Sequence, residues 1–214
     1  MPERRRPVAN LLGLAVLGLL IERPMHPYEM ATTLRDRNKD TSFNVKRASL
    51  YDVVDALHRA GWIEAQGTER AGRRPERTVY AQTDLGHAEF ITWLDELLRT
   101  PVKEFPSFLG AVSYLGALGP ERAAEALEDR IARLDEEIDR LRQAQDKVLG
   151  EQVPRLFVIE IDYVITMAEA ERDWADRMVR DIRSGALGWP TLETRNGTAL
   201  WVTPDGQATV PPPL

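Results

Sequence analysis

The chain has 214 residues, of which 43% are hydrophobic and 29% are charged, as expected for a folded protein with one or two small domains. It contains no cysteine, which excludes disulfides and thiolate metal sites. The net charge of -6 is unevenly distributed: residues 1–82 are basic on balance and the remainder is acidic. This division favours a polyanion as a partner of the N-terminal part.

An apolar run from Leu11 to Ile21 follows Arg4, Arg5 and Arg6. The pattern is compatible with a secretory signal or with the first helix of a folded domain. No small-x-small cleavage motif follows the run, and the next residues, Glu22-Arg23-Pro24, are charged and end a helix. We therefore predict a buried first helix. The preceding arginines are interpreted either as an arm that contacts phosphates or as a solvated basic terminus.

Two more helices are predicted before residue 62. Pro27 suits the first turn of one of them, with His26 as its starting residue, and a polar connection over 38–45 follows. The next helix ends at the stop signal Gly61. Its apolar positions recur at helical spacing and are predicted to be core: Leu50, Val53, Val54 and Leu57.

The period then changes to that of strands. Residues 62–66 and 77–82 are short β-favouring runs, and the Gly-, Arg- and Pro-rich segment between them predicts a protruding turn. A further amphipathic helix follows, capped by Thr83 or Asp84.

The second half of the chain is predicted to be helical. A short helix over 107–118 precedes two long helices, 127–148 and 157–182, whose apolar residues recur in steps of three and four. Glu171 falls on this stripe, where it would pair with an arginine, lie at a seam edge or contact an effector. We predict that these helices form a dimer seam made of Leu127, Ile131, Leu134, Ile138, Leu141, Phe157, Ile161, Val164 and Met178.

Three helices followed by a basic hairpin form a winged helix-turn-helix pattern. The third helix fits a major groove about 12 Å wide, and an arginine-rich hairpin can follow the phosphates. Tyr51 is equally well explained as a packing residue. The candidate DNA-binding residues are Lys46, Arg47, Ser49 and Tyr51 of the third helix and Arg70, Arg73, Arg74 and Arg77 of the hairpin.

The sequence here resembles the PadR family of bacterial transcription regulators. The resemblance spans about residues 8–184 and rests on a Leu-rich first helix followed by three short motifs. The matching positions are His26, Tyr28, Glu29, Ser49, Leu50, Tyr51, Gly72, Arg73, Tyr80, Thr83 and Gly86. Pro27, Ala48 and Asp52 depart from the family pattern. Because Asp52 puts an acidic side chain beside the predicted DNA-binding face, the contacts of this helix with DNA should differ from those of the family pattern.

The resemblance implies a mainly α fold: a winged helix-turn-helix domain with its linking helix over 1–100, and an antiparallel long-helix dimerisation domain over 101–184. Residues 185–214 are expected to form a tail in which Asn196-Gly197 turns a small hairpin before a disordered end.

The implied function is that of a cytoplasmic homodimeric repressor, released by a small-molecule effector and bound to double-stranded DNA at an inverted repeat. A winged-helix adaptor that binds protein instead of DNA is the alternative. No Ser, His and acid arrangement announces an enzyme, and three scattered histidines predict neither a metal site nor a cofactor. A small aromatic or apolar effector is expected among Trp93, Phe108, Tyr114 and Trp174, although the same aromatics would also serve as joint packing.

Overall fold

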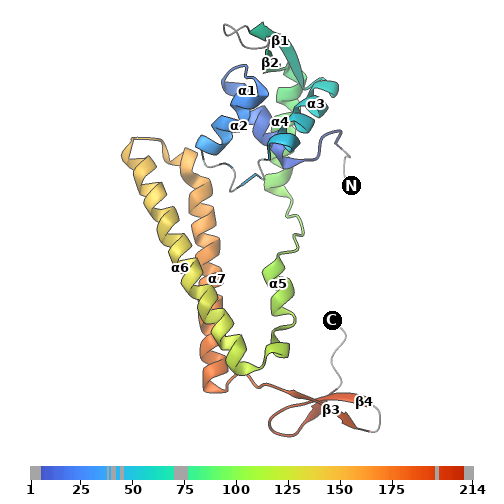
Figure 1. The fold of residues 1–214 in the computed structure, drawn as a ribbon, viewed down its shortest axis with the longest axis vertical. Coiled ribbons are helices and arrows are strands. Elements are labelled where there is room, and N and C mark those ends of the chain that lie inside the picture. The colour runs from blue at the N-terminus through green and yellow to red at the C-terminus, as the bar shows by residue number, and fades with distance from the viewer. Residues whose placement is uncertain are drawn as a thin grey trace. The chain divides into compact units, whose positions relative to one another are not determined.

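The computed structural model describes residues 6–37, 39, 42–43, 46–69, 77–195 and 198–209. The chain divides into two compact units, Met1–Glu104 and Phe105–Leu214. Figure 1 shows the helices and strands of each.

Unit 1 is built around α1 (Leu11–Glu22), which is buried on most of its sides. Asn10 caps this helix, since its side-chain oxygen accepts a hydrogen bond from the Leu12 amide at 3.0 Å. The prediction that the apolar run forms a core helix is confirmed. Around it pack α2 (Pro27–Asp36), α3 (Arg47–Arg59) and α4 (Asp84–Arg99).

The core of unit 1 joins residues from all four helices. The predicted core residues of α3, namely Leu50, Val53, Val54 and Leu57, are buried there. His26 begins α2 as predicted: its Nδ1 accepts a hydrogen bond from the Tyr28 amide at 3.0 Å. Trp93 of α4 is also part of this core.

The hairpin consists of β1 (Ile63–Glu69) and β2 (Arg77–Gln82), which pair antiparallel with a bulge between Ala65 and Gly67. Thr83 caps α4: its hydroxyl accepts from the Gly86 amide at 3.0 Å and donates to the Gly61 carbonyl at 2.7 Å. A Cβ on Gly86 would lie 1.9 Å from the Trp62 carbonyl oxygen. Only glycine therefore allows α4 to approach the backbone of Trp62, just before β1, this closely.

Unit 2 contains α5 (Ser107–Val112), a 3-10 turn η1 (Leu115–Leu118), and the long helices α6 (Pro120–Gly150) and α7 (Ile159–Ser184), with η2 (Arg155–Val158) between them. The two long helices pack side by side (Figure 1). Ion pairs join them in antiparallel order, with Arg183 on Glu128 at 3.1 Å and Arg142 on Glu169.

A small sheet closes unit 2. Strands β3 (Thr191–Arg195), β4 (Thr198–Val202) and β5 (Ala208–Thr209) lie in that order, and each pair is antiparallel. Just before it, Trp189 packs on the α6–α7 core and its Nε1 donates to the Gly116 carbonyl at 3.0 Å. The predicted turn at Asn196-Gly197 and the predicted disordered end, residues 210–214, lie outside the described residues.

Candidate nucleic-acid interface

The outward face of α3 is opposite its buried residues. By helical spacing the centre of this face carries Ala48, Asp52, Asp55 and Arg59, all of them exposed. Two candidates flank it: Tyr51 is 44% exposed and Ser49 is half-buried. The exposure of Tyr51 leaves its ring and hydroxyl available to a partner.

The start of α3 is basic. Lys46 lies exposed at the N-cap position and makes no side-chain capping hydrogen bond among the described residues. Arg47 is the first helical residue, but its side chain lies outside the described part. A cation and first-turn amides without a side-chain cap form an arrangement suited to an anion such as a DNA phosphate.

The two strands of the hairpin lie next to the C-terminal end of α3. Arg77 begins β2, with its side chain outside the described part of the chain. The predicted wing residues Arg70, Arg73 and Arg74 also lie outside the described residues.

Several contacts fix the hairpin against the helices. Met25, just before α2, forms a two-hydrogen-bond bridge with Tyr80 of β2, at 3.0 Å in each direction. The Tyr80 ring packs edge-on against His58 of α3 with 5.6 Å between ring centroids, and His58 Nδ1 lies 3.1 Å from the Ile63 carbonyl oxygen. Neither Met25 nor His58 has a role that the sequence predicts, because only tertiary pairing brings them to the hairpin.

The segment before α1 also packs on the domain. The Arg6 guanidinium lies over the Trp93 ring, 5.4 Å from its centroid, and donates to Glu96 at 2.5 Å. Its side chain is only 11% exposed. Arg6 therefore holds the N-terminal segment on α4, and it is neither a solvated residue nor part of a free arm.

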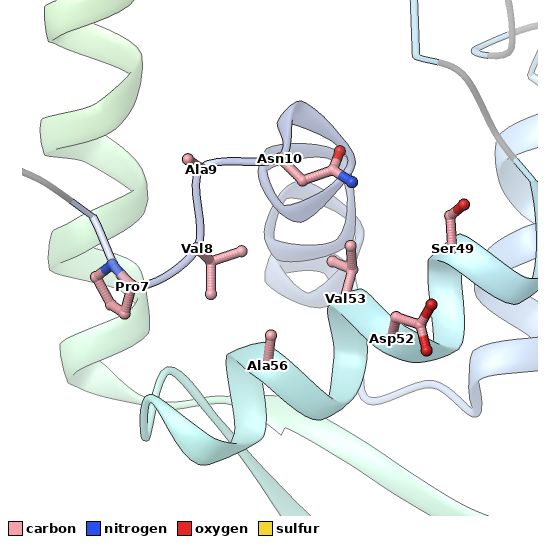
Figure 2. A pocket seen from close by; sticks show the side chains of 8 residues that line it. All are labelled: Pro7, Val8, Ala9, Asn10, Ser49, Asp52, Val53 and Ala56. Atoms are coloured by element: carbon pink, nitrogen blue, oxygen red, sulfur yellow. The ribbon is translucent and has the colours of Figure 1, made fainter.

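Between this segment and α3 lies an open hollow of about 280 Å³ (Figure 2). Pro7, Val8, Ala9 and Asn10 form one side, and Ser49, Asp52, Val53 and Ala56 form the other. The hollow adjoins the outward face of α3.

The four predicted effector residues divide between the units. Trp93 is a core residue of unit 1, whereas the other three belong to unit 2. There, Phe108 and Trp174 meet edge-to-face with centroids 5.7 Å apart, and Tyr114 is 79% exposed. Arg130 stacks on Phe108 at 3.6 Å and pairs with Glu171 at 2.5 Å, so Glu171 is the partner of an arginine.

The predicted dimer seam has two parts. Leu127 and Ile138 are 3% exposed within the single chain, so a second subunit can cover little more of them. Phe157 and Val164 are exposed, and the rest of the seam is half-buried: Ile131, Leu134, Leu141, Ile161 and Met178. Exposed apolar side chains also extend over the start of α7 and the turn before it, at Leu156, Ile159, Tyr163 and Met167.

The described residues contain no group of three His, Cys, Asp or Glu side chains placed to hold a metal ion. In the same residues, no helix combines the length and apolar character needed to cross a membrane.

Comparison with known proteins identifies the N-terminal domain. No curated protein matches the chain. The PadR regulator of Bacillus subtilis bound to operator DNA has the same fold, with a TM-score of 0.67, 18% identity, and coverage of 82% of this chain and 99% of that one. The Bacillus subtilis PadR structure with p-coumaric acid gives a TM-score of 0.67 at 17% identity over 81% and 99% of the two chains.

The Vibrio cholerae virulence activator AphA is also similar in fold, with a TM-score of 0.59 and 14% identity over 81% of this chain and 98% of its own. The winged helix with long C-terminal helices is thus the fold of this chain, as predicted. The sequence model of one family matches the segment from the middle of α1 to the middle of α4. Residues 16–91 of this chain therefore form a domain of the transcriptional regulator PadR-like family.

Proposed function

We propose that this chain is a DNA-binding transcriptional regulator that inserts α3 into the major groove of its operator. The observation that carries the proposal is the arrangement of unit 1: α3 has a basic start and an exposed outward face, and its other end packs against a hairpin whose connecting segment contains three arginines. The family of the domain and the operator complex of a protein with the same fold support it. In this proposal the protein acts in the cytoplasm and has no catalytic role.

The regulator acts as a homodimer in this proposal. The exposed apolar side chains around η2 and the first turns of α7 are too extensive for a solvated helix face, and a second copy is the partner that would cover them. A two-fold dimer reads an inverted repeat, with half-sites about one helical turn apart or a multiple of that.

We further propose repression released by a small molecule. A Bacillus subtilis PadR structure contains p-coumaric acid, a planar aromatic acid. In unit 2, the half-buried rings of Phe108 and Trp174 offer stacking surfaces to a ligand of that kind, and a carboxylate on the ligand would compete with Glu171 for Arg130. Trp93 and Tyr114 remain candidates from the sequence. AphA is described as an activator, so the sign of regulation needs its own measurement.

The test is binding of the full chain to duplex fragments of its own upstream DNA over a range of salt concentrations. Replacing Arg73 and Arg74 with alanine, which gives the wing variant, should weaken binding to all duplexes alike. It should also lower the log-log salt slope by about 0.9 for each phosphate that the protein no longer neutralises. The matched control replaces Arg140 and Arg180 of unit 2, which pair with Glu137 and Asp176.

The control has the same net charge as the wing variant and should bind DNA like the wild type. An unchanged salt slope in the wing variant would show that the hairpin arginines do not contact DNA phosphates. If the wild type binds no duplex at any salt concentration, the adaptor function replaces DNA binding.

A further inference from the structure

The charge along the exposed face of α3 changes sign. Lys46 lies exposed at the N-terminal end and Arg59 at the last helical residue, whereas Asp52 and Asp55 occupy the middle of the face. A groove presents phosphates at its two walls and base edges on its floor. A helix with cations at its ends and acids between them has the charge pattern that suits this arrangement.

An aspartate on such a helix is restricted in what it can contact. An ionised carboxylate only accepts hydrogen bonds, so phosphates and the acceptor atoms of guanine and thymine repel it. Adenine offers an amino group but also the N7 acceptor beside it. Cytosine presents its N4 amino group without an acceptor of its own on that edge, and it is the base that carboxylates select in the major groove.

Asp52 is better placed for this than Asp55. It lies in the first half of α3, where recognition helices contact bases, and one turn after Ser49. Both Ser49 and Asp52 border the open hollow, so the carboxylate has free space beside it (Figure 2).

Two polar side chains near the hollow have partners of their own. The Asn10 side chain caps α1, and the Arg6 guanidinium is held by Glu96 and Trp93. Among the described residues no cation forms an ion pair with Asp52. The carboxylate therefore keeps its accepting capacity for an external donor.

We propose that Asp52 is a specificity-determining residue that accepts a hydrogen bond from the N4 amino group of one cytosine in each operator half-site. The inference rests on the proposed function and deepens it, because it assigns one base and one residue to the recognition. Asp52 contributes selectivity, and its charge weakens binding to unrelated DNA.

The experiment is selection of bound duplexes from a randomised library by the full-length wild type and by Asp52→Asn, Asp52→Ala and Asp55→Asn. The wild type should select a cytosine at one position of each half-site. Asp52→Asn should select adenine there, since an amide pairs with both N6 and N7 of adenine. Asp52→Ala should lose the preference by about tenfold or more and bind random duplexes more tightly.

Asp55→Asn removes the same charge from the same helix face and should keep the wild-type cytosine. The assignment is overturned if the Asp52 variants select the wild-type sequence unchanged, or if Asp55→Asn alone shifts the base. If the wild type selects a sequence and the Asp52 variants select the same one, only this inference is refuted. A wild type that selects no sequence refutes the proposed function as well.

Discussion

The two units bury their apolar residues to different extents. In unit 1 the core includes large side chains from four helices and the start of the hairpin, such as Leu17, Met30, Leu50 and Ile63. The largest buried cluster of unit 2 is smaller: three of its five residues are alanines, namely Ala123, Ala124 and Ala175, and the others are Leu127 and Ile182. Ile138, Val158 and Ile165 are buried outside this cluster. Alanine lets two helices approach closely but contributes little buried area.

Two further features distinguish unit 2 from unit 1. Ion pairs such as Arg130–Glu171 and Arg172–Asp135 link its long helices, but half-exposed pairs contribute about 1 kcal/mol or less each. It also leaves large apolar side chains exposed, Phe157 at 67% and Tyr163 at 66%. Unit 1 therefore has a large apolar core of its own, whereas unit 2 exposes apolar side chains that the proposed second copy would cover.

The largest expected effect is in unit 1. Gly86→Ala would place a Cβ 1.9 Å from the Trp62 carbonyl oxygen, a backbone atom that cannot move without separating α4 from the residue that precedes β1. We expect a loss of about 3 kcal/mol or more in the free energy of unfolding, measured by urea denaturation. Gly110→Ala in α5 is the control, since a Cβ there meets no atom within 4 Å and should be neutral or slightly stabilising. Equal stability of the two variants would contradict the close approach.

The second effect concerns the partner surface of unit 2. The double substitution Phe157→Asp and Tyr163→Asp should raise the dissociation constant of the dimer by about hundredfold or more, because each aromatic side chain covered by a partner contributes roughly 1.5–3 kcal/mol. Light scattering over a concentration series measures this, and circular dichroism should show an unchanged helical content. Leu192→Asp on β3, also exposed, should leave the dimer intact. A wild type that is monomeric at micromolar concentration would disprove the dependence of unit 2 on a second copy.

A smaller effect is expected where α5 joins the long helices. Arg130→Ala removes both the stacking on Phe108 at 3.6 Å and the pair with Glu171, and should lower stability by about 1 kcal/mol. Arg140→Ala breaks a pair within α6 at an exposed site and should change stability by less than about half of that. The urea midpoints of the two variants give the difference, and coinciding midpoints would show that the Arg130 contacts contribute nothing.

The smallest effect is a pH dependence in unit 1. A hydrogen bond from Arg37 lowers the pKa of the Glu22 carboxyl below its ordinary value of 4.5, against a smaller opposing effect of burial. Stability from this pair is therefore present above pH 4.5 and is lost as the pH falls through the lowered pKa. Because both side chains are 46% exposed, we expect less than about 1 kcal/mol.

Arg37→Gln should lower the urea midpoint above pH 6 by the small contribution of this pair and leave the midpoint at pH values below the lowered pKa of Glu22 almost unchanged, so the fall of the midpoint on acidification should be flatter than in the wild type. A variant that loses stability as steeply as the wild type on acidification would show that Glu22 is not the group involved.

Local patterns in the sequence determined much of this protein. An unbroken apolar run defined α1, and apolar residues at helical spacing defined α3, α6 and α7. Stop signals such as Gly61 and Gly185 marked helix ends, because periodicity and capping act over one or two turns. The order of helices and strands, with the short motifs around Ser49 and Thr83, was enough to indicate the family. These features depend on neighbours in the chain, so the sequence contains them directly.

Tertiary structure decided which face of each element meets which partner. From the sequence, the apolar stripe around Leu127 and Ile138 fits a contact between two chains as well as a contact within one chain. Only the packing of α6 on α7 shows that these two residues are buried within the single chain. Likewise Arg6 looks like a solvated cation until Trp93 and Glu96, remote in sequence, are brought beside it. The Met25–Tyr80 bridge and the Gly86–Trp62 contact arise in the same way. Such contacts join residues far apart in the chain, and their energy depends on a geometry that no local pattern encodes.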